Sequence, residues 1–370
     1  MTDTDRQHMR HALSLAARGL GRVWPNPAVG CVIVNDGRVV GRGRTVDGGR
    51  PHAETQALAV AGHQAAGATV YVTLEPCAHQ GQTPPCVDAL ISAGVGRVVI
   101  ACGDPDPRVA GKGIEKLKKA GIPVTTNFLD DEAQELQKGF LSRVRLGRPT
   151  LTLKLGMTLD GRIATASGES QWITGPDARR DVHRLRSSHD AVLIGAGTAR
   201  TDDPMLTVRG FGNVPQPIRV VASRHLRLLD QSQLMATASE TPVWLICGDD
   251  AAQTDVAETW RANGAEIIPV DTQNGQIAPR ALLSALGSKG ITRVFCEGGG
   301  TLGASLLAEG CVDDLVVFTA GKLLGAEGQP GVGALGLSAL SDAPEFELVS
   351  VQRIGNDVRH HWRRPVTVAD

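Results

Sequence analysis

Three short stretches decide the fold of the first part of the chain: Pro51-His52-Ala53-Glu54, Glu75-Pro76-Cys77 and Pro84-Pro85-Cys86. One imidazole and two thiols are the donor set that suits Zn²⁺ with a fourth position left for water. A bound Zn²⁺ lowers the pKa of such a water towards about 7, and Glu54 can carry a proton from it to a departing amine. The stretches therefore predict a catalytic zinc site, with His52, Cys77 and Cys86 as ligands and Glu54 as the proton carrier.

A purely structural zinc site is the alternative, and it normally closes with a fourth protein ligand. His79 could supply that ligand, although a position facing the substrate or solvent suits it better. A lone His-x-Glu, or two cysteines nine residues apart, is usually incidental, but the ordered combination of all three stretches is much rarer by chance. The remaining cysteines lie in or beside apolar runs and are expected to fill the core: Cys31, Cys102, Cys247, Cys296 and Cys311.

Helix and strand patterns alternate on both sides of the metal motif. Apolar residues recur at helical spacing from Met9 to Leu20, which predicts an amphipathic first helix. Because strands separated by helices pack with helices on both sheet faces, we expect an α/β, three-layer domain. Further helices are expected at 53–61, 86–93 and 114–120, and strands at 28–34, 38–41, 69–74, 97–102 and 123–126.

The pattern pauses at residues 141–149, where basic residues, a Gly and a Pro give the best domain boundary. We expect two domains, at 1–146 and 147–370. The second is again α/β, with apolar strand runs at 150–155, 191–194, 218–221, 243–247, 267–270, 293–296 and 315–319, and a possible closing hairpin from 347–351 and 358–362.

Composition narrows the class of protein. The 370 residues carry 38 basic and 39 acidic side chains, a formal net charge of -1, which gives no electrostatic footprint for nucleic acid or an anionic membrane. The start of the chain is polar, no apolar run is long enough for a membrane span, and seven scattered cysteines suit reduced thiols or metal ligands. We expect a cytoplasmic enzyme acting on small molecules.

The metal motif also carries a family resemblance. Together with Pro25-Asn26-Pro27-Ala28-Val29-Gly30 it resembles the cytidine deaminase-like fold. The loop Gly81-Gln82-Thr83-Pro84-Pro85-Cys86, the run Asp104-Pro105-Asp106-Pro107 and the run Val109-Ala110-Gly111-Lys112-Gly113 narrow this to the riboflavin-pathway pyrimidine deaminases. The resemblance implies that Asn26 binds the pyrimidine, although Asn26 could also be a simple turn residue. One departure is Thr45, near which the family often has a His.

The second domain lacks a G-x-G-x-x-G after its first strand, so a standard Rossmann fingerprint is missing. It offers instead the segments 154–164, 168–174, 195–204 and 297–306. In the last of these, Gly298, Gly299 and Gly300 follow a strand and open a helix, where backbone N–H groups can bind a phosphate. Glycines at such a turn can also serve packing alone.

Taken together, these segments resemble the reductase domain of the same bifunctional riboflavin enzymes, which has a dihydrofolate reductase-like fold. The resemblance spans nearly the whole chain, and it implies NADPH as cofactor and a homo-oligomer. By position it implies that the cofactor is lined by Gly156, Trp172, Thr198, Asp202, Ser223, Gly299, Gly300, Thr301, Leu302, Gly303, Ala304 and Ser305, and that the substrate is held by Ser170, Arg186, Leu206, Arg209 and Glu297.

Elementary chemistry supports several of these roles and leaves others open. Arg186 and Arg209 offer planar donor forks for a 5′-phosphate, but could be solvated surface arginines. Glu297 could be a structural cap and Trp172 could be core packing. Asp202 is a candidate proton relay. Ser223 follows Ala222, where the family commonly has Asp, which weakens its assignment.

The sequence therefore predicts a bifunctional riboflavin-pathway enzyme. Its first site would hydrolyse the exocyclic amine of 2,5-diamino-6-(5-phosphoribosylamino)pyrimidin-4-one. Its second would use NADPH to reduce the ribosyl chain of 5-amino-6-(5-phosphoribosylamino)uracil. The competing hypotheses are a deaminase of tRNA or free nucleosides with an accessory domain, and a non-catalytic nucleotide sensor built on a decayed enzyme. The neutral charge disfavours the tRNA version of the first hypothesis. The second is disfavoured by intact His52, Glu54, Cys77 and Cys86.

Overall fold

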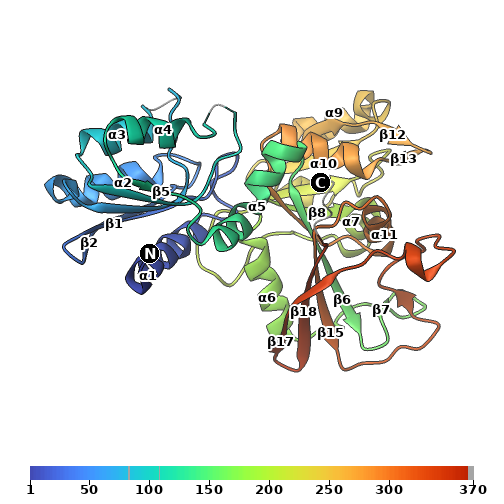
Figure 1. Cartoon of the computed structure of the whole chain (residues 1–370). Helices are drawn as coiled ribbons and strands as arrows, with labels where there is room; N and C mark the ends of the chain where they lie inside the picture. Colours follow the sequence, from blue (N-terminus) through green and yellow to red (C-terminus); the bar gives the residue numbers. More distant parts are fainter. Residues whose placement is uncertain (82–83, 108, 366–370) are drawn as a thin grey trace. The chain divides into compact units, whose positions relative to one another are not determined.

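The computed structural model describes residues 1–81, 84–107 and 109–365. Gln82 and Thr83 of the predicted metal-site loop lie outside these residues. Contacts divide the chain into two compact units, Met1–Gly147 and Arg148–Asp370 (Figure 1). Within the described residues, no helix has the length and apolar character needed to cross a membrane.

The first unit is built on a five-stranded sheet in the order β2-β1-β3-β4-β5. β1 runs antiparallel to β2 and β3, whereas β3, β4 and β5 are parallel. The strands are β1 (Gly30–Asn35), β2 (Arg38–Arg44), β3 (Thr69–Leu74), β4 (Arg97–Cys102) and β5 (Val124–Thr125). The helices are α1 (Asp3–Ala17), α2 (Ala53–Ala61), α3 (Cys86–Ser92), α4 (Lys112–Lys119) and α5 (Asp130–Leu146), with a 3-10 turn at Gly62–Ala65.

Two strand glycines set the layers of this unit. A Cβ on Gly30 would lie 1.9 Å from the Ala12 carbonyl oxygen of α1, and a Cβ on Gly43 would lie 2.3 Å from the Ala53 carbonyl oxygen of α2. Gly43 pairs with Cys31, and neighbouring residues of a strand point to opposite faces, so α1 and α2 cover opposite sides of the sheet. The three-layer arrangement expected from the sequence is confirmed. Close approach at Gly43 also fixes α2, which begins directly after His52.

The second unit contains a nine-stranded sheet in the order β11-β10-β9-β8-β14-β6-β15-β18-β17. All neighbours from β11 to β15 are parallel, and β18 and β17 add an antiparallel edge. The strands are β6 (Thr150–Thr158), β8 (Ala191–Gly195), β9 (Ile218–Ala222), β10 (Val243–Cys247), β11 (Glu266–Pro269), β14 (Arg293–Cys296), β15 (Asp314–Ala320), β17 (Glu347–Ile354) and β18 (Asp357–Arg363).

Helices connect these strands, and two small sheets lie outside the main one. The helices are α6 (Pro176–Arg186), α7 (Ala196–Asp202), α8 (Gln233–Ala236), α9 (Asp255–Ala262), α10 (Pro279–Ser288) and α11 (Gly300–Ala308), with 3-10 turns at Ala251–Gln253 and Leu340–Asp342. The small sheets pair β7 (Arg162–Ala164) with β16 (Gln329–Pro330), and β12 (Thr272–Gln273) with β13 (Gln276–Ile277).

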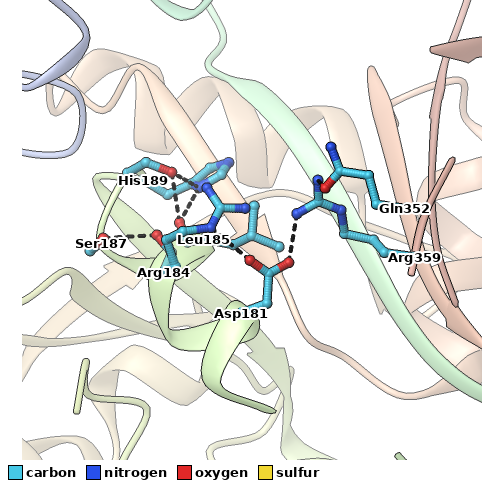
Figure 2. A network of polar contacts seen from close by, with 8 residues as sticks. Asp181, Arg184, Leu185, Ser187, His189, Gln352 and Arg359 are labelled. Carbon is cyan, nitrogen blue, oxygen red and sulfur yellow. Dashed lines mark hydrogen bonds and ion pairs between the residues drawn. The ribbon is translucent and has the colours of Figure 1, made fainter. Parts of the chain in front are cut away.

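A polar network holds α6 to the closing hairpin β17–β18 (Figure 2). The Asp181 carboxylate accepts from Arg184 Nε at 2.6 Å and from Arg359 of β18, also at 2.6 Å. Arg359 in turn donates to Gln352 Oε1 of β17 at 2.6 Å. The Asp181 and Arg359 side chains are mostly buried, so the ion pair is shielded from solvent. It fixes the helix that carries Arg186.

Candidate active sites

The first site forms where three elements meet. His52 is the N-cap of α2, Cys77 follows β3, and Cys86 is the first residue of α3. His52 Nδ1 lies 3.2 Å from Cys86 Sγ and 3.6 Å from Cys77 Sγ, and the three potential ligand atoms lie within 4.8 Å of one another. The structure thus brings together the predicted ligand set, and His79 is not part of the group. This donor set fits Zn²⁺.

Burial shapes the charges at this site. Glu54, in the first turn of α2, is only 3% exposed; burial, and after it the negative charge of Cys77, raise the pKa of its carboxyl to about 7. A hydrogen bond from Cys86 lowers the pKa of the Cys77 thiol to about 4, although burial opposes the shift. The backbone N–H of Cys86 also donates to Cys77 Sγ at 3.3 Å, so Cys77 is stabilised as a thiolate, the form that binds metal.

Asn26 lies beside the segment that leads into His52. A Cβ on Gly49, three residues before His52, would lie 1.9 Å from Asn26 Nδ2. Thr45 is buried; its hydroxyl donates to the Pro27 carbonyl at 3.1 Å and accepts from the Val29 N–H at 3.0 Å. Thr45 therefore fixes the turn that presents Asn26.

Glu75 belongs to the Glu75-Pro76-Cys77 stretch of the sequence motif, which gave it no role, and the structure shows it as a structural residue of this site. It follows β3, is 4% exposed, and its carboxylate accepts backbone N–H bonds from Gly111 at 3.1 Å, Gly113 at 3.0 Å and Ile114 at 3.3 Å. A Cβ on Gly113 would lie 2.3 Å from the Pro76 carbonyl oxygen. These hydrogen bonds and the close packing at Gly113 hold the start of α4 against the Glu75-Pro76-Cys77 segment. In the sequence, the signal that could have indicated this role is an acidic residue directly after an apolar strand.

The second unit contains a cavity of about 920 Å³ at the carboxyl ends of β8, β9 and β14 and beside the middle of β6. In parallel sheets this edge is the usual place for a ligand. Of the predicted cofactor and substrate residues, those that line it are Gly156, Ser170, Thr198, Asp202, Ser223, Glu297, Gly299, Gly300, Thr301, Leu302 and Ser305. Its volume lies within the usual range for cofactor pockets.

The start of α11 forms a cradle within this cavity. A Cβ on Gly298 would lie 2.7 Å from Leu302 Cδ2, and a Cβ on Gly300 would lie 3.0 Å from the Pro330 carbonyl oxygen. The Gly299 N–H donates to Thr198 Oγ1 at 3.2 Å, which joins the start of α7 to the start of α11. Exposed N–H groups at a helix start suit a pyrophosphate, so the cradle fits a dinucleotide.

Arg186 and Glu297 bind each other. Arg186 Nε donates to Glu297 Oε1 at 2.5 Å and its second fork arm donates to Oε2 at 3.1 Å, while its third nitrogen donates to the Thr207 carbonyl at 2.9 Å. Burial raises the pKa of the Glu297 carboxyl, but the charge and hydrogen bonds of Arg186 lower it by more. The net effect is a lowered pKa. Glu297 lines the cavity and Arg186 does not, so Arg186 orients the Glu297 carboxylate here.

Five other predicted site residues are not among the described residues that line the cavity. Trp172 is 60% exposed, and the guanidinium carbon of Arg179 stacks over its ring, 4.6 Å from the ring centroid. Arg209 is exposed, and its backbone N–H donates to His183 Nδ1 at 3.3 Å. The other three are buried: Leu206, and Gly303 and Ala304 on α11.

Lys154 is a cavity residue that the sequence motif contained but did not single out. It lies in the middle of β6, and a Cβ on Gly156 would lie 3.3 Å from its Nζ. Burial lowers the pKa of its ammonium group, and the charges of Glu297 and Asp202 partly offset that shift. A lysine within an otherwise apolar strand was the signal, because burying a charge requires partners.

Comparisons with known proteins match both parts of the chain to described families. Residues 2–102 match the family model "Cytidine and deoxycytidylate deaminase zinc-binding region", and residues 149–359 match "RibD C-terminal domain". The riboflavin biosynthesis protein RibD of Escherichia coli strain K12 is 44% identical over 369 residues, covering 96% of this chain and 98% of the relative.

Solved structures extend the same relationship to the fold of the whole chain. An Acinetobacter baumannii RibD structure has a TM-score of 0.88 at 39% identity, covering 98% of this chain and 99% of that one. A Thermotoga maritima diaminohydroxyphosphoribosylaminopyrimidine deaminase/5-amino-6-(5-phosphoribosylamino)uracil reductase has a TM-score of 0.87 at 34% identity, with the same coverage. The chain belongs to the RibD family, the bifunctional deaminases and reductases of riboflavin biosynthesis.

Proposed function

We propose that residues 1–146 deaminate 2,5-diamino-6-(5-phosphoribosylamino)pyrimidin-4-one and that residues 147–370 reduce 5-amino-6-(5-phosphoribosylamino)uracil. The observation that carries this proposal is the convergence of His52, Cys77 and Cys86 beside buried Glu54. The Thermotoga maritima relative is named for both reactions, as a deaminase and a reductase.

In the deaminase site, His52, Cys77 and Cys86 would hold Zn²⁺, which acts as a Lewis acid that makes a water molecule nucleophilic near neutral pH. The Glu54 carboxylate accepts a proton from the attacking water and delivers one to the exocyclic nitrogen, which leaves as ammonia. Asn26 packs against Gly49, three residues before His52, and would hydrogen-bond the pyrimidine.

In the reductase site, the residues of the cavity would hold NADPH, which when bound would supply the hydride. Reducing a ribosylamine to its ribityl form adds a hydride to C1′ and a proton to the ring oxygen, so the cavity must contain a proton donor. The Lys154 ammonium and the Asp202 carboxyl both line it, and burial raises the pKa of Asp202. We assign proton delivery to this pair and alignment of the sugar hydroxyls to Glu297, which Arg186 orients.

We assign the remaining predicted residues of the reductase site either to the cofactor or to the substrate. The cradle Gly299–Ser305 and Thr198 would hold the pyrophosphate, with Gly156, Ser223 and Trp172 along the rest of the cofactor. Ser170 would contact the substrate within the cavity. Leu206 and Arg209 do not line the cavity, and their assignment to the substrate, Arg209 through its phosphate, rests on the family resemblance alone. We further propose a homo-oligomer working in the cytoplasm; none of the seven cysteines, all of which the structure describes, forms a disulfide, which suits a reducing compartment.

A pair of substitutions tests the two-site proposal. Glu54→Gln should reduce ammonia release by about 100-fold or more and leave NADPH oxidation with the deaminated substrate unchanged. Lys154→Met should do the opposite. Parallel loss of both activities in either variant, with thermal unfolding unaltered, would contradict two independent sites.

A further inference from the structure

The turn that carries Asn26 is held by helix α5 of the first unit. Asn26 lies between Pro25 and Pro27, in a segment outside the helices and strands that ends where β1 begins at Gly30. We propose that Gln137 of α5 is a positioning residue of the deaminase, which fixes the backbone of this turn and thereby directs the Asn26 side chain towards the pyrimidine. This inference rests on the proposed function and adds a residue that acts on the substrate only through Asn26.

Two carbonyl groups of the turn accept hydrogen bonds from side chains of α5. Gln137 Nε2 donates to the Ala28 carbonyl at 2.7 Å, and Arg143 Nη2 donates to the Pro25 carbonyl at 3.1 Å. Backbone carbonyls that lie outside a sheet need such partners when they are buried, and Ala28 is 3% exposed. The two donors therefore hold the backbone on both sides of Asn26.

Gln137 is a rigid anchor because core residues fix its helix. It is 2% exposed, and the nearby α5 residues Ala133, Phe140 and Leu141 belong to the hydrophobic core of the first unit. A buried side-chain amide needs a hydrogen-bond partner, which the Ala28 carbonyl supplies. Replacing the amide by an apolar group would remove a partner from that buried carbonyl.

The connection between the Ala28 carbonyl and Asn26 is short and stiff. Pro27 lies between them, and its ring fixes φ at about −65°. The residue before a proline is also restricted, which applies to Asn26. A shift of Ala28 would therefore move Asn26 as well. A Cβ on Gly49 would lie 1.9 Å from Asn26 Nδ2, so the Asn26 side chain already sits in close contact with the segment that leads to the metal site.

A double-mutant cycle tests whether Gln137 acts through Asn26. Gln137→Met keeps the length of the side chain and removes the donor. In the full-length, zinc-loaded protein it should lower kcat/KM for ammonia release by about tenfold, because displacing a positioned group by about 1 Å can cost up to about 100-fold. Asn26→Ala should lower kcat/KM by about 10- to 100-fold. In the Asn26→Ala background, Gln137→Met should have an effect of less than about twofold, since two residues that act on the same contact are not additive.

Gln134→Met is the matched control. Gln134 is exposed on the same helix and donates to Asp130 Oδ2 at 2.6 Å, so the same substitution there should leave kcat/KM within about twofold of the wild type. Arg143→Gln tests the second hydrogen bond to the turn and should lower kcat/KM by about threefold, again only while Asn26 is present. Because Arg143 is only partly buried, this variant also provides the test where Gln137→Met is unstable.

Hydrogen exchange adds a readout that needs no turnover. The amides of residues 26–30 should exchange about tenfold faster in Gln137→Met than in the wild type or in Gln134→Met. Unchanged exchange, a kcat/KM equal to that of Gln134→Met, or an equal loss in the Asn26→Ala background would overturn the positioning role. If the wild type releases no ammonia from the diaminopyrimidinone while the exchange rates still differ, the proposed function fails and the hold of α5 on the turn stands.

Discussion

At the scale of single residues, burial and hydrogen bonding change the pKa of a side chain and therefore its charge. Asp5 illustrates this away from both active sites. It is 6% exposed, and burial alone would raise the pKa of its carboxyl. Hydrogen bonds from the Thr2 N–H at 2.8 Å and the Tyr71 hydroxyl at 2.6 Å, with the charge of Arg97, instead lower that pKa to about 2 from an ordinary 3.8. The ionised carboxylate thus joins the first helix to β3 and β4.

A pH dependence of stability follows from Asp5. Because its pKa is lower in the folded than in the unfolded chain, its ionisation stabilises the fold above about pH 4, by about 1 to 2 kcal/mol. That contribution should disappear as the pH falls from about 4 towards 2. Wild type and Asp5→Asn should therefore differ most near neutral pH and converge in acid. Residual deaminase activity after incubation in urea measures this; a difference that grows in acid would refute it.

At the scale of elements, the sequence predicted strands more completely than contacts between segments. The runs at 243–247 and 293–296 match β10 and β14, and the closing hairpin is confirmed as β17 and β18. Each of these strands could be found because apolar residues mark its own segment of the sequence. The β7–β16 pair and the contact of Glu75 with Gly111–Ile114 join residues far apart in the chain, and no local pattern encodes such distances.

The same distinction applies to the sites. His52, Glu54, Cys77 and Cys86 could be found from the sequence because their spacing is set by helix starts and a strand end. Lys154 could not be assigned a role, because its significance depends on Glu297 and Asp202 sharing its cavity. Arg186 was expected to bind the substrate, yet its fork is taken up by Glu297, a pairing that only the assembled sheet reveals.

The fastening of α4 by Glu75 yields a prediction at this scale. Glu75→Gln keeps one oxygen acceptor but loses the charge that three backbone N–H groups share, so α4 and the Cys77 segment should loosen. Supporting residues of metal sites typically change metal affinity by about 10- to 100-fold, and we expect a loss of that size in competition titrations with Zn²⁺. Glu115→Gln, on the exposed face of α4, is the matched control and should bind Zn²⁺ normally. Equal affinity in both variants would restrict Glu75 to helix capping.

At the scale of the whole molecule, each activity has its own core. One hydrophobic cluster contains only residues of the first unit, from Met9 to Leu141, and the two clusters around β8–β10 and around α6 with β14 and β15 contain only residues of the second. The zinc ligands belong to the first unit and the cofactor cavity to the second. Loss of metal should therefore stay local.

Removing zinc with a chelator tests that independence. Ammonia release should fall by about 100-fold or more and return on adding Zn²⁺, because the proton carrier Glu54 has no activated water to serve. NADPH oxidation with the deaminated substrate should change by less than about twofold, since all three residues of the proposed zinc site, His52, Cys77 and Cys86, belong to the first unit. When zinc-free samples are heated, cooled and assayed after Zn²⁺ is added back, the temperature that destroys half of the deaminase activity should be lower than for the zinc-loaded protein, because bound metal stabilises the unit that binds it, and the corresponding temperature for the reductase should not change. If chelation also abolished the reductase, the second unit would depend on the first for its folded cavity.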